Sequence, residues 1–321
     1  MPNKLLKVLL VCLLLAIIFS GSHISLRPII KNTDSSIEFV SAIESTQFTN
    51  SSVVEYGNVE LRWLGHAGFQ FKTQNIVVYV DPYGLNLDRY YAMADYIICT
   101  HDHYDHCNTA DIARLSDNKT TILTVRQAEK KLSYGLVDYK EVIYILPNDT
   151  RSFGDISFEF VPAYNIQGEY HPKWKNYVGV ILDFNGARFY HAGDTDHIPE
   201  MKTFDTNIAL LPVSGASQMT AEEAVEAVES LKISSSNLEL AIPIHYGFPG
   251  QPGTAYDAQY FHRNADVDTL IMAMYTGEEE PIITENTQSV SGFGWFIGLI
   301  VLGTGFVIYN QRRKETKRLI T

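Results

Sequence analysis

The sequence of 321 residues predicts a mixed α/β fold in which two β-sheets pack together and helices flank them. Short runs rich in Val, Ile, Tyr and Phe recur from residue 58 onward, and turn residues separate them. The Asn185-Gly186 pair between two such runs is a strong signal for a β-hairpin. Segments with helical periodicity are fewer and lie among these runs. With 45% hydrophobic and 19% charged residues, the chain is expected to form a sizeable core, which excludes disorder as its main state.

The predicted strands share a high content of β-branched and aromatic residues. They are Val59–Leu64, Gly68–Phe71, Ile76–Val80, Tyr96–Cys99, Thr121–Val125, Val142–Leu146, Ile156–Val161, Val178–Phe184, Arg188–His191, Ile208–Leu211 and Leu240–Ile244. The clearest helix is Ala221–Leu231, because Thr220 and Glu223 form a capping box before a row of apolar residues. Three further helices are predicted, at 109–115, 126–132 and 256–263.

The first 22 residues have the three parts of a secretory signal. Lys4 and Lys7 precede twelve consecutive apolar residues, Val8–Phe19, and small residues follow. We therefore expect 1–22 to be a signal peptide or, alternatively, an uncleaved signal anchor.

At the other end, residues 292–309 are almost wholly apolar or glycine, and no charged residue lies between Glu285 and Arg312. This run is long enough to span a bilayer, and the basic tail at 310–321 is typical of a stop-transfer signal. We predict a transmembrane helix at 292–309, with a docking helix in the protein core as the alternative.

The remaining boundaries follow from composition. Residues 23–57 are rich in Ser, Thr and Asn and are interpreted as a lead-in or tether, 58–281 as the folded domain and 282–291 as a linker. Because basic segments next to a membrane span favour the cytoplasm, both basic ends are expected on that side. The protein is therefore predicted to be membrane-anchored, with its folded domain outside the cytoplasm and its tail inside.

The charge of the chain is unevenly distributed. The formal net charge is −12, but residues 1–22 and 310–321 together carry +6 and the 287 residues between them carry −18. Clustered Lys and Arg bind the phosphates of nucleic acids, and an acidic surface repels them. Nucleic acid is therefore not expected as a partner.

The most informative segment directly follows the predicted strand 96–99 and contains three histidines and two aspartates within six residues. They are His101, Asp102, His103, Asp105 and His106. A loop at a strand end can bring imidazoles and carboxylates together on a metal ion, and neutral imidazole suits zinc. The alternative is a solvated surface loop, which further motifs downstream disfavour.

The pattern His-x-His-x-Asp-His at 101–106 resembles the signature of the metallo-β-lactamase superfamily. Four further motifs match in order, namely Trp63-Leu64-Gly65-His66-Ala67-Gly68-Phe69, Val80-Asp81-Pro82, His191-Ala192-Gly193-Asp194-Thr195 and Ile244-His245-Tyr246-Gly247. The first two are similar to the branch of ascorbate-6-phosphate lactonase-like and N-acylphosphatidylethanolamine phospholipase D-like hydrolases. The resemblance covers about 58–276. It implies an αββα sandwich with two divalent ions between the sheets, usually Zn²⁺, with Mn²⁺ or Fe²⁺ as the other candidates.

The resemblance also implies the metal ligands. His101 and His103 would bind the first ion, Asp105, His106 and His245 the second, and Asp194 would bridge them. The third ligand of the first ion departs from the pattern, because Asn165 stands where the phospholipase-like members have a histidine after Pro-Ala-x. His171 is the candidate replacement. If His171 does not fill this role, the first site is weaker or the enzyme works with one metal.

Two divalent ions in a cleft lower the pKa of a bridging water and polarise the scissile bond, which gives a hydroxide nucleophile near neutral pH. Asp105, or water that it holds, could deliver a proton to the leaving group. His66 and Asp81 are assigned to orienting the ligand imidazoles. The alternatives are a satisfied core histidine for His66 and an Asp-Pro turn for Asp81. His191 is expected to pack or to support the site rather than to bind metal.

These observations together predict a membrane-anchored metal-dependent hydrolase that cleaves an ester, lactone, amide or phosphodiester bond. The substrate would be a small molecule or a lipid, and loops that a single sequence does not decode set its class. Tyr164, Tyr170, Trp174 and Tyr246 are candidates for the pocket wall, although aromatic residues more often belong to the core. One alternative is a non-catalytic metal-binding surface protein, which an open coordination position disfavours. The other is a nuclease of the same superfamily, which the charge of −18 disfavours.

Overall fold

The computed structural model describes residues 52–274, 282–283, 301–302 and 305–306. The predicted signal at 1–22 and the basic tail at 310–321 lie outside these residues. Within the described part, none of the helices combines the length and the apolar character that crossing a membrane requires. Four residues of the predicted span 292–309 are described, and they form a short antiparallel pair, β16 (Val301–Leu302) and β17 (Gly305–Phe306). This pair belongs to a separate unit, residues 285–321.

The first sheet has the order β15-β1-β2-β3-β4-β5-β6-β7 in the described residues. Its strands are β1 (Val53–Tyr56), β2 (Val59–Gly65), β3 (Gly68–Lys72), β4 (Val77–Val80), β5 (Tyr96–Cys99), β6 (Thr121–Thr124), β7 (Glu141–Tyr144) and β15 (Ile282–Ile283). Neighbours from β1 to β4 are antiparallel, and neighbours from β4 to β7 are parallel.

The second sheet has the order β14-β13-β12-β11-β10-β9-β8. Its strands are β8 (Thr150–Phe153), β9 (Ile156–Pro162), β10 (Val178–Phe184), β11 (Ala187–His191), β12 (Ile208–Pro212), β13 (Leu240–Ile244) and β14 (Asp268–Thr269). The hairpin predicted at Asn185-Gly186 joins β10 and β11, and both residues have positive φ there. From β11 to β14 the neighbours are parallel.

Both faces of the first sheet are buried, because side chains alternate along each strand. In β4, Val78 and Val80 belong to the core between the sheets, and Tyr79 belongs to a second core on the other face. That second core is closed by α2 (Thr109–Leu115) and α3 (Glu129–Tyr134).

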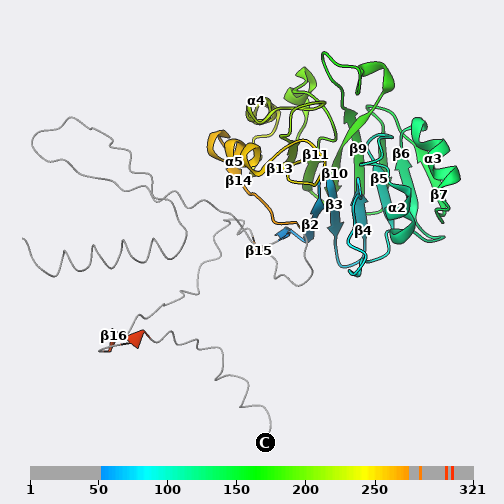
Figure 1. Ribbon diagram of the computed structural model, residues 1–321, viewed down its shortest axis with the longest axis horizontal. Coiled ribbons are helices and arrows are strands. Elements are labelled where there is room, and N and C mark those ends of the chain that lie inside the picture. The colour runs from blue at the N-terminus through cyan, green and yellow to red at the C-terminus, as the bar shows by residue number, and fades with distance from the viewer. Residues whose placement is uncertain (1–51, 275–281, 284–300, 303–304, 307–321) are drawn as a thin grey trace, which may run out of the picture. The chain divides into compact units, whose positions relative to one another are not determined.

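Two further helices pack on the strands of the second sheet. They are α4 (Ala221–Ser234) and α5 (Ala255–Asn264). Figure 1 shows α2 and α3 on one side of the paired sheets and α4 and α5 on the other. The predicted two-sheet sandwich with flanking helices is therefore confirmed.

All eleven predicted strands are present, with ends that differ by at most two residues. The helix predicted at 126–132 begins as a short 3₁₀ turn, η1 (Arg126–Ala128), before α3. The first sheet extends beyond the predicted folded domain 58–281, because β1 lies inside the predicted lead-in and β15 inside the predicted linker. In β1, Val53 and Val54 are buried, and Val54 pairs with Leu61 of β2. This strand is too short to stand out from the Ser- and Asn-rich sequence before it.

Candidate metal centre

The candidate site lies where strands of both sheets end. His66 follows β2, Asp81 follows β4 and the 101–106 loop follows β5, whereas Asp194 and His245 come shortly after β11 and β13 of the second sheet. The three strands of the first sheet run in one direction, and so do the two of the second. Their carboxyl ends therefore form one edge in each sheet, and the side chains of the following turns converge there.

Three of these turns have left-handed backbone at a residue other than glycine. The φ angle is 54° at His66, 48° at Asp81 and 61° at His245. A side chain in this conformation costs ~1–3 kcal/mol, and such residues are concentrated at functional sites. The surrounding structure therefore holds these three residues against their local backbone preference.

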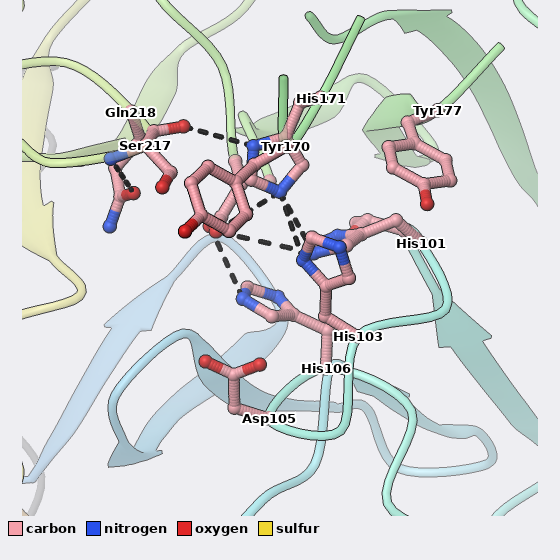
Figure 2. A network of polar contacts seen from close by, with 12 residues as sticks. His101, His103, Asp105, His106, Tyr170, His171, Tyr177, Ser217 and Gln218 are labelled. Atoms are coloured by element: carbon pink, nitrogen blue, oxygen red, sulfur yellow. Dashed lines mark hydrogen bonds and ion pairs between the residues drawn. The ribbon is translucent and has the colours of Figure 1, made fainter. Parts of the chain in front are cut away.

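The first cluster consists of His101, His103 and His171. Nε2 of His171 lies 3.1 Å from Nδ1 of His103 and 3.4 Å from Nε2 of His101. Figure 2 shows the ring of His171 approaching His101 and His103 from a different segment of the chain and pointing at both. The structure thus brings the candidate replacement ligand to the two motif histidines.

The second cluster consists of His66, Asp105, His106 and His245, whose ligand atoms lie within 4.8 Å of one another. Nε2 of His66 lies 3.1 Å from Oδ2 of Asp105, and the ring centroids of His66 and His245 are 3.7 Å apart. The sequence predicted that His66 orients a ligand imidazole. Its polar contact is instead with a carboxylate, because the turn after β2 places the ring between Asp105 and the face of His245.

Asp194 lies between the two clusters and directs one carboxylate oxygen at each. Oδ2 is 3.6 Å from Nε2 of His171 and 4.0 Å from Nε2 of His101. Oδ1 is 3.2 Å from Nε2 of His106 and 3.4 Å from Nε2 of His245. Oδ1 of Asp194 and Nε2 of His106 are buried and make no hydrogen bond within the described structure.

Asp81 supports one histidine of each cluster. Its Oδ2 accepts hydrogen bonds from Nδ1 of His106 and from Oγ1 of Thr100, each at 2.7 Å. Oγ1 of Thr100 is in turn 3.0 Å from Nδ1 of His101. These contacts hold the Nδ1 side of both rings and leave Nε2 directed at the clusters, which agrees with the orienting role predicted for Asp81.

Burial lowers the pKa of most histidines in the clusters. The pKa of His66 and that of His171 fall to about 4, with burial as the main cause. Burial also lowers the pKa of His101 and His103. These imidazoles are therefore neutral near pH 7, which is the form that binds a metal ion.

For His106 and the carboxylates, contacts with neighbouring groups outweigh burial in setting the pKa. Burial would lower the pKa of His106, but the charges of Asp194 and Asp81 outweigh burial and raise it. Burial would raise the pKa of Asp194, but His106 and His245 lower it. Burial opposes ionisation of Asp105 too, yet the contact with His66 brings its pKa to about 2. The site therefore contains ionised carboxylates and favours positive charge between them.

These side chains fit divalent cations. Ligand nitrogens on a tetrahedral zinc ion lie ~3.3 Å apart, because the Zn–N distance is ~2.0–2.1 Å. The spacings of 3.1 and 3.4 Å around Nε2 of His171 agree with this value. A cation beside Asp194 and His106 would also satisfy the two buried atoms that make no hydrogen bond.

A cavity of about 620 Å³ opens onto both clusters. Its lining residues are Asp102, His103, Tyr104, Asp105, Lys131, Tyr170, His171, Asp194, Ser217, Gln218, His245, Gln251 and Pro252. Of the aromatic residues predicted for a pocket wall, Tyr170 lines this cavity. The others lie elsewhere, since Tyr246 stacks on Trp63 in the core, Tyr164 is buried and Trp174 is exposed. His191 packs as predicted, with Nε2 2.7 Å from the carbonyl of Ala67.

Several residues around the clusters were not predicted. Nε2 of Gln218 is 2.7 Å from Nδ1 of His245, and Oγ of Ser214 is 3.1 Å from the same atom. Asn165 and the carbonyl of Ser217 contact His171. These residues lie 27 to 46 positions from the histidine they contact, apart from Asn165, so no local pattern connects them. Thr100 could have been found, because it directly precedes His101.

Residues 60–245 match the family described as the beta-lactamase superfamily domain. The chain belongs to this family. It is 31% identical to a UPF0173 protein of Pyrococcus abyssi over 201 residues, which cover 60% of this chain and 85% of that protein. A UPF0173 metal-dependent hydrolase of Sulfolobus acidocaldarius is 29% identical over 199 residues, covering 58% of this chain and 84% of that protein.

A solved structure from Parabacteroides distasonis, named as a metal-dependent hydrolase, is also similar to this beta-lactamase superfamily member. It has 29% identity and a TM-score of 0.55, and the match covers 67% of this chain and 92% of that one. The predicted superfamily and the prediction of a metal-dependent hydrolase are confirmed. The lactonase-like and phospholipase-like branch within the superfamily stays a prediction.

Proposed function

We propose that this metal-dependent hydrolase works with two divalent cations that share Asp194. His101, His103 and His171 would hold the first ion, and Asp105, His106 and His245 the second. The observation that carries this proposal is the division of the Asp194 carboxylate, whose Oδ2 faces the first cluster and whose Oδ1 faces the second. Zn²⁺ is the ion we propose first, because neutral imidazoles dominate the ligand set and their spacing suits tetrahedral coordination.

Other residues of the chain would orient the metal ligands and handle protons. Asp81 and Thr100 orient His106 and His101, and Gln218 holds His245. His66 keeps Asp105 ionised by contact with Oδ2. Asp105 also lines the cavity, so its ionised carboxylate can hold a water that passes a proton to a leaving group.

The reaction that we propose is hydrolysis of an ester, lactone, amide or phosphodiester. Two bound divalent cations supply activation of water and polarisation of the scissile bond in one place. The cavity has room for a small molecule or one end of a lipid. Tyr104, Tyr170 and Lys131 line it together with the acidic residues, so a substrate with both apolar and polar groups would be accommodated.

We also propose that the catalytic domain is tethered to a membrane and faces away from the cytoplasm. Support comes from the sequence alone: apolar runs at 8–19 and 292–309, each with basic residues on its outer side. Protease treatment of intact cells tests this proposal. Digestion of the domain 58–281 from outside supports it, and complete protection until the cells are lysed would contradict it.

Metal analysis combined with a substrate panel tests the catalytic proposal. The full chain is purified, stripped with a chelator and reloaded with Zn²⁺, Mn²⁺ or Fe²⁺. Turnover is then measured on esters, lactones, amides, phosphodiesters and RNA. We expect metal-dependent cleavage in at least one of the first four classes, lost in His103→Ala and kept in the exposed control Asp155→Asn. Cleavage of RNA alone, or of no member of the panel, would contradict the proposal.

A further inference from the structure

Asn165 connects three segments of the chain at the first cluster. It lies three residues beyond Pro162, the last residue of β9, and it is almost fully buried, at 7% exposure. It contacts His171 in the same loop, Asp196 after β11 and Ser217 after β12. In all three contacts the Asn165 side chain is hydrogen-bonded to protein atoms, so it is engaged in supporting its neighbours rather than in binding metal.

The backbone of Asn165 closes the loop that carries His171. The N–H of Asn165 donates to the carbonyl of His171 at 2.7 Å, and the N–H of His171 donates to Oδ1 of Asn165 at 3.2 Å. Gly168 lies in this loop, and a Cβ there would approach the Asn165 side chain to 3.0 Å. Asn165 therefore closes the base of the loop between residues 165 and 171 through both its backbone and its side chain.

The Asn165 side chain supplies one acceptor to Nδ1 of His171 and holds the second acceptor, the Ser217 carbonyl, through its Nδ2. Nδ1 of His171 is 3.1 Å from Oδ1 of Asn165 and 3.0 Å from the carbonyl oxygen of Ser217. Both neighbours are acceptors, so Nδ1 must be the donor in the neutral ring. The lone pair then lies on Nε2, the atom that faces His101 and His103.

The orientation of the Asn165 amide is itself fixed. Its Nδ2 donates to Oδ1 of Asp196 and to the carbonyl of Ser217, each at 2.7 Å. Rotating the amide by half a turn would place Oδ1 against these two acceptors and Nδ2 against the two N–H groups of His171. Asp196 is held in place as well, because its Oδ2 accepts from the N–H of Ile166 at 2.7 Å.

We propose that Asn165 is the positioning residue that makes His171 a metal ligand, by imposing the Nδ1–H form of the ring and by closing the loop that presents it. This inference rests on the proposed function, because it takes His171 as a ligand of the first ion. It assigns a role to the position where a histidine would be expected from the superfamily resemblance. Here the asparagine supports a histidine six residues further on.

The test compares Asn165→Ala, His171→Ala and Asn165→Asp with Gln167→Ala, an exposed amide in the same loop that serves as the control. Zinc per chain and zinc affinity are measured by elemental analysis and chelator competition in the full-length protein. Removing a partner that orients a ligand weakens metal affinity ~10–100-fold, so we expect that loss at the first ion in Asn165→Ala. Gln167→Ala should match the wild type.

A second readout separates positioning from a general structural effect. Long-range ¹H–¹⁵N spectra of the metal-free protein report the tautomer of each histidine ring. We expect the Nδ1–H form at His171 in the wild type and a smaller share of it in Asn165→Ala, where the Ser217 carbonyl alone accepts. Asn165→Asp keeps the oxygen at Nδ1 but sets its second oxygen against Asp196 and the Ser217 carbonyl, so it should also weaken binding of the first ion. An unchanged tautomer and wild-type affinity in Asn165→Ala, with one ion lost in His171→Ala, would overturn this inference alone. Retention of both ions in His171→Ala would overturn the proposed first site and this inference with it.

Discussion

The two clusters of candidate metal ligands are placed by different parts of the fold. In the second cluster, His66 and His245 lie in turns with left-handed backbone at the ends of β2 and β13. In the first cluster, His171 comes from the long segment between β9 and β10, in which Ile166, Tyr170 and Trp174 are exposed. Loop residues support both clusters, Gln218 at His245 and Asn165 at His171. The difference is that His66 and His245 come directly after strands, whereas His171 lies in a loop that Asn165 closes. Asp194 therefore faces one group of side chains placed by strand ends and another placed partly by a loop.

Replacing the shared carboxylate should have the largest effect. In Asp194→Asn both clusters lose an ionised oxygen, and Nε2 of His106 and Nε2 of His245 lose their carboxylate partner. We expect both ions to be lost and activity to fall by more than the ~10–100-fold typical of an indirect support residue. Elemental analysis measures the metal, with Asp155→Asn as the control. A protein that keeps one tightly bound ion would show that the clusters do not depend on Asp194 equally.

Asp81→Asn should have the next largest effect, because Asp81 supports His106 directly and His101 through Thr100. We expect both ions to bind ~10–100-fold more weakly. Thr100→Val removes the contact with His101 and one hydrogen bond to Asp81, which keeps its contact with His106. It should therefore weaken the first ion more than the second. Chelator competition curves resolve the two sites. Equal losses at both ions in Thr100→Val would contradict the separate support of the two clusters.

Acidification tests the neutral histidines in the metal-free protein. His66 and His171 have a pKa of about 4 when folded, against ~6.5 in an unfolded chain. Between these values the unfolded chain binds more protons, so lowering the pH destabilises the folded state. The loss is ~1.4 kcal/mol per pH unit for each histidine. His106 acts in the opposite sense, since its raised pKa gives stability that is complete below pH ~6.5 and is lost as the pH rises through the folded pKa.

Urea unfolding over the range from pH ~6.5 to ~4 checks this prediction. The free energy of unfolding should fall less steeply with acidification in His171→Ala than in the wild type, because one proton-linked group has been removed. Identical slopes in the two proteins would contradict a neutral, buried His171.

The smallest effect is expected far from both clusters. Thr220 caps α4 by accepting from the N–H of Glu223 at 3.2 Å, and the Glu223 carboxylate accepts from the N–H of Thr220 at 2.8 Å. Thr220→Ala should reduce the free energy of unfolding by ~1 kcal/mol and leave metal binding unchanged. Thermal or urea unfolding measures the first and elemental analysis the second. A loss of metal would show that the outer helix layer takes part in setting the site.

The sequence alone could suggest the candidate ligands that lie close together in the chain or follow predicted strands. His101, His103, Asp105 and His106 occupy one loop, Asp194 comes shortly after the predicted strand 188–191, and His245 directly follows the apolar strand 240–244. The strands themselves were predictable, because alternating and continuous apolar runs match their buried faces. His171 could be proposed because a required position was filled by Asn165 and another histidine lay nearby.

Other features were beyond the sequence because they depend on distant parts of the chain meeting. Gln218 reaches His245 and the Ser217 carbonyl reaches His171 only after β12 is placed in the second sheet. The contact of His66 with Asp105 depends on left-handed backbone at His66, which the sequence does not predict at a residue other than glycine. β1 was missed for a related reason, since its four residues are stabilised by pairing with β2 rather than by length.

The most direct test of the account is the number of zinc ions bound per chain in the wild type and in His171→Ala, after stripping and reloading at equal free zinc. If the two clusters share Asp194 and His171 completes the first, the wild type binds two ions and His171→Ala binds one. A wild type that saturates with one ion, or a His171→Ala protein that still binds two, would contradict the account.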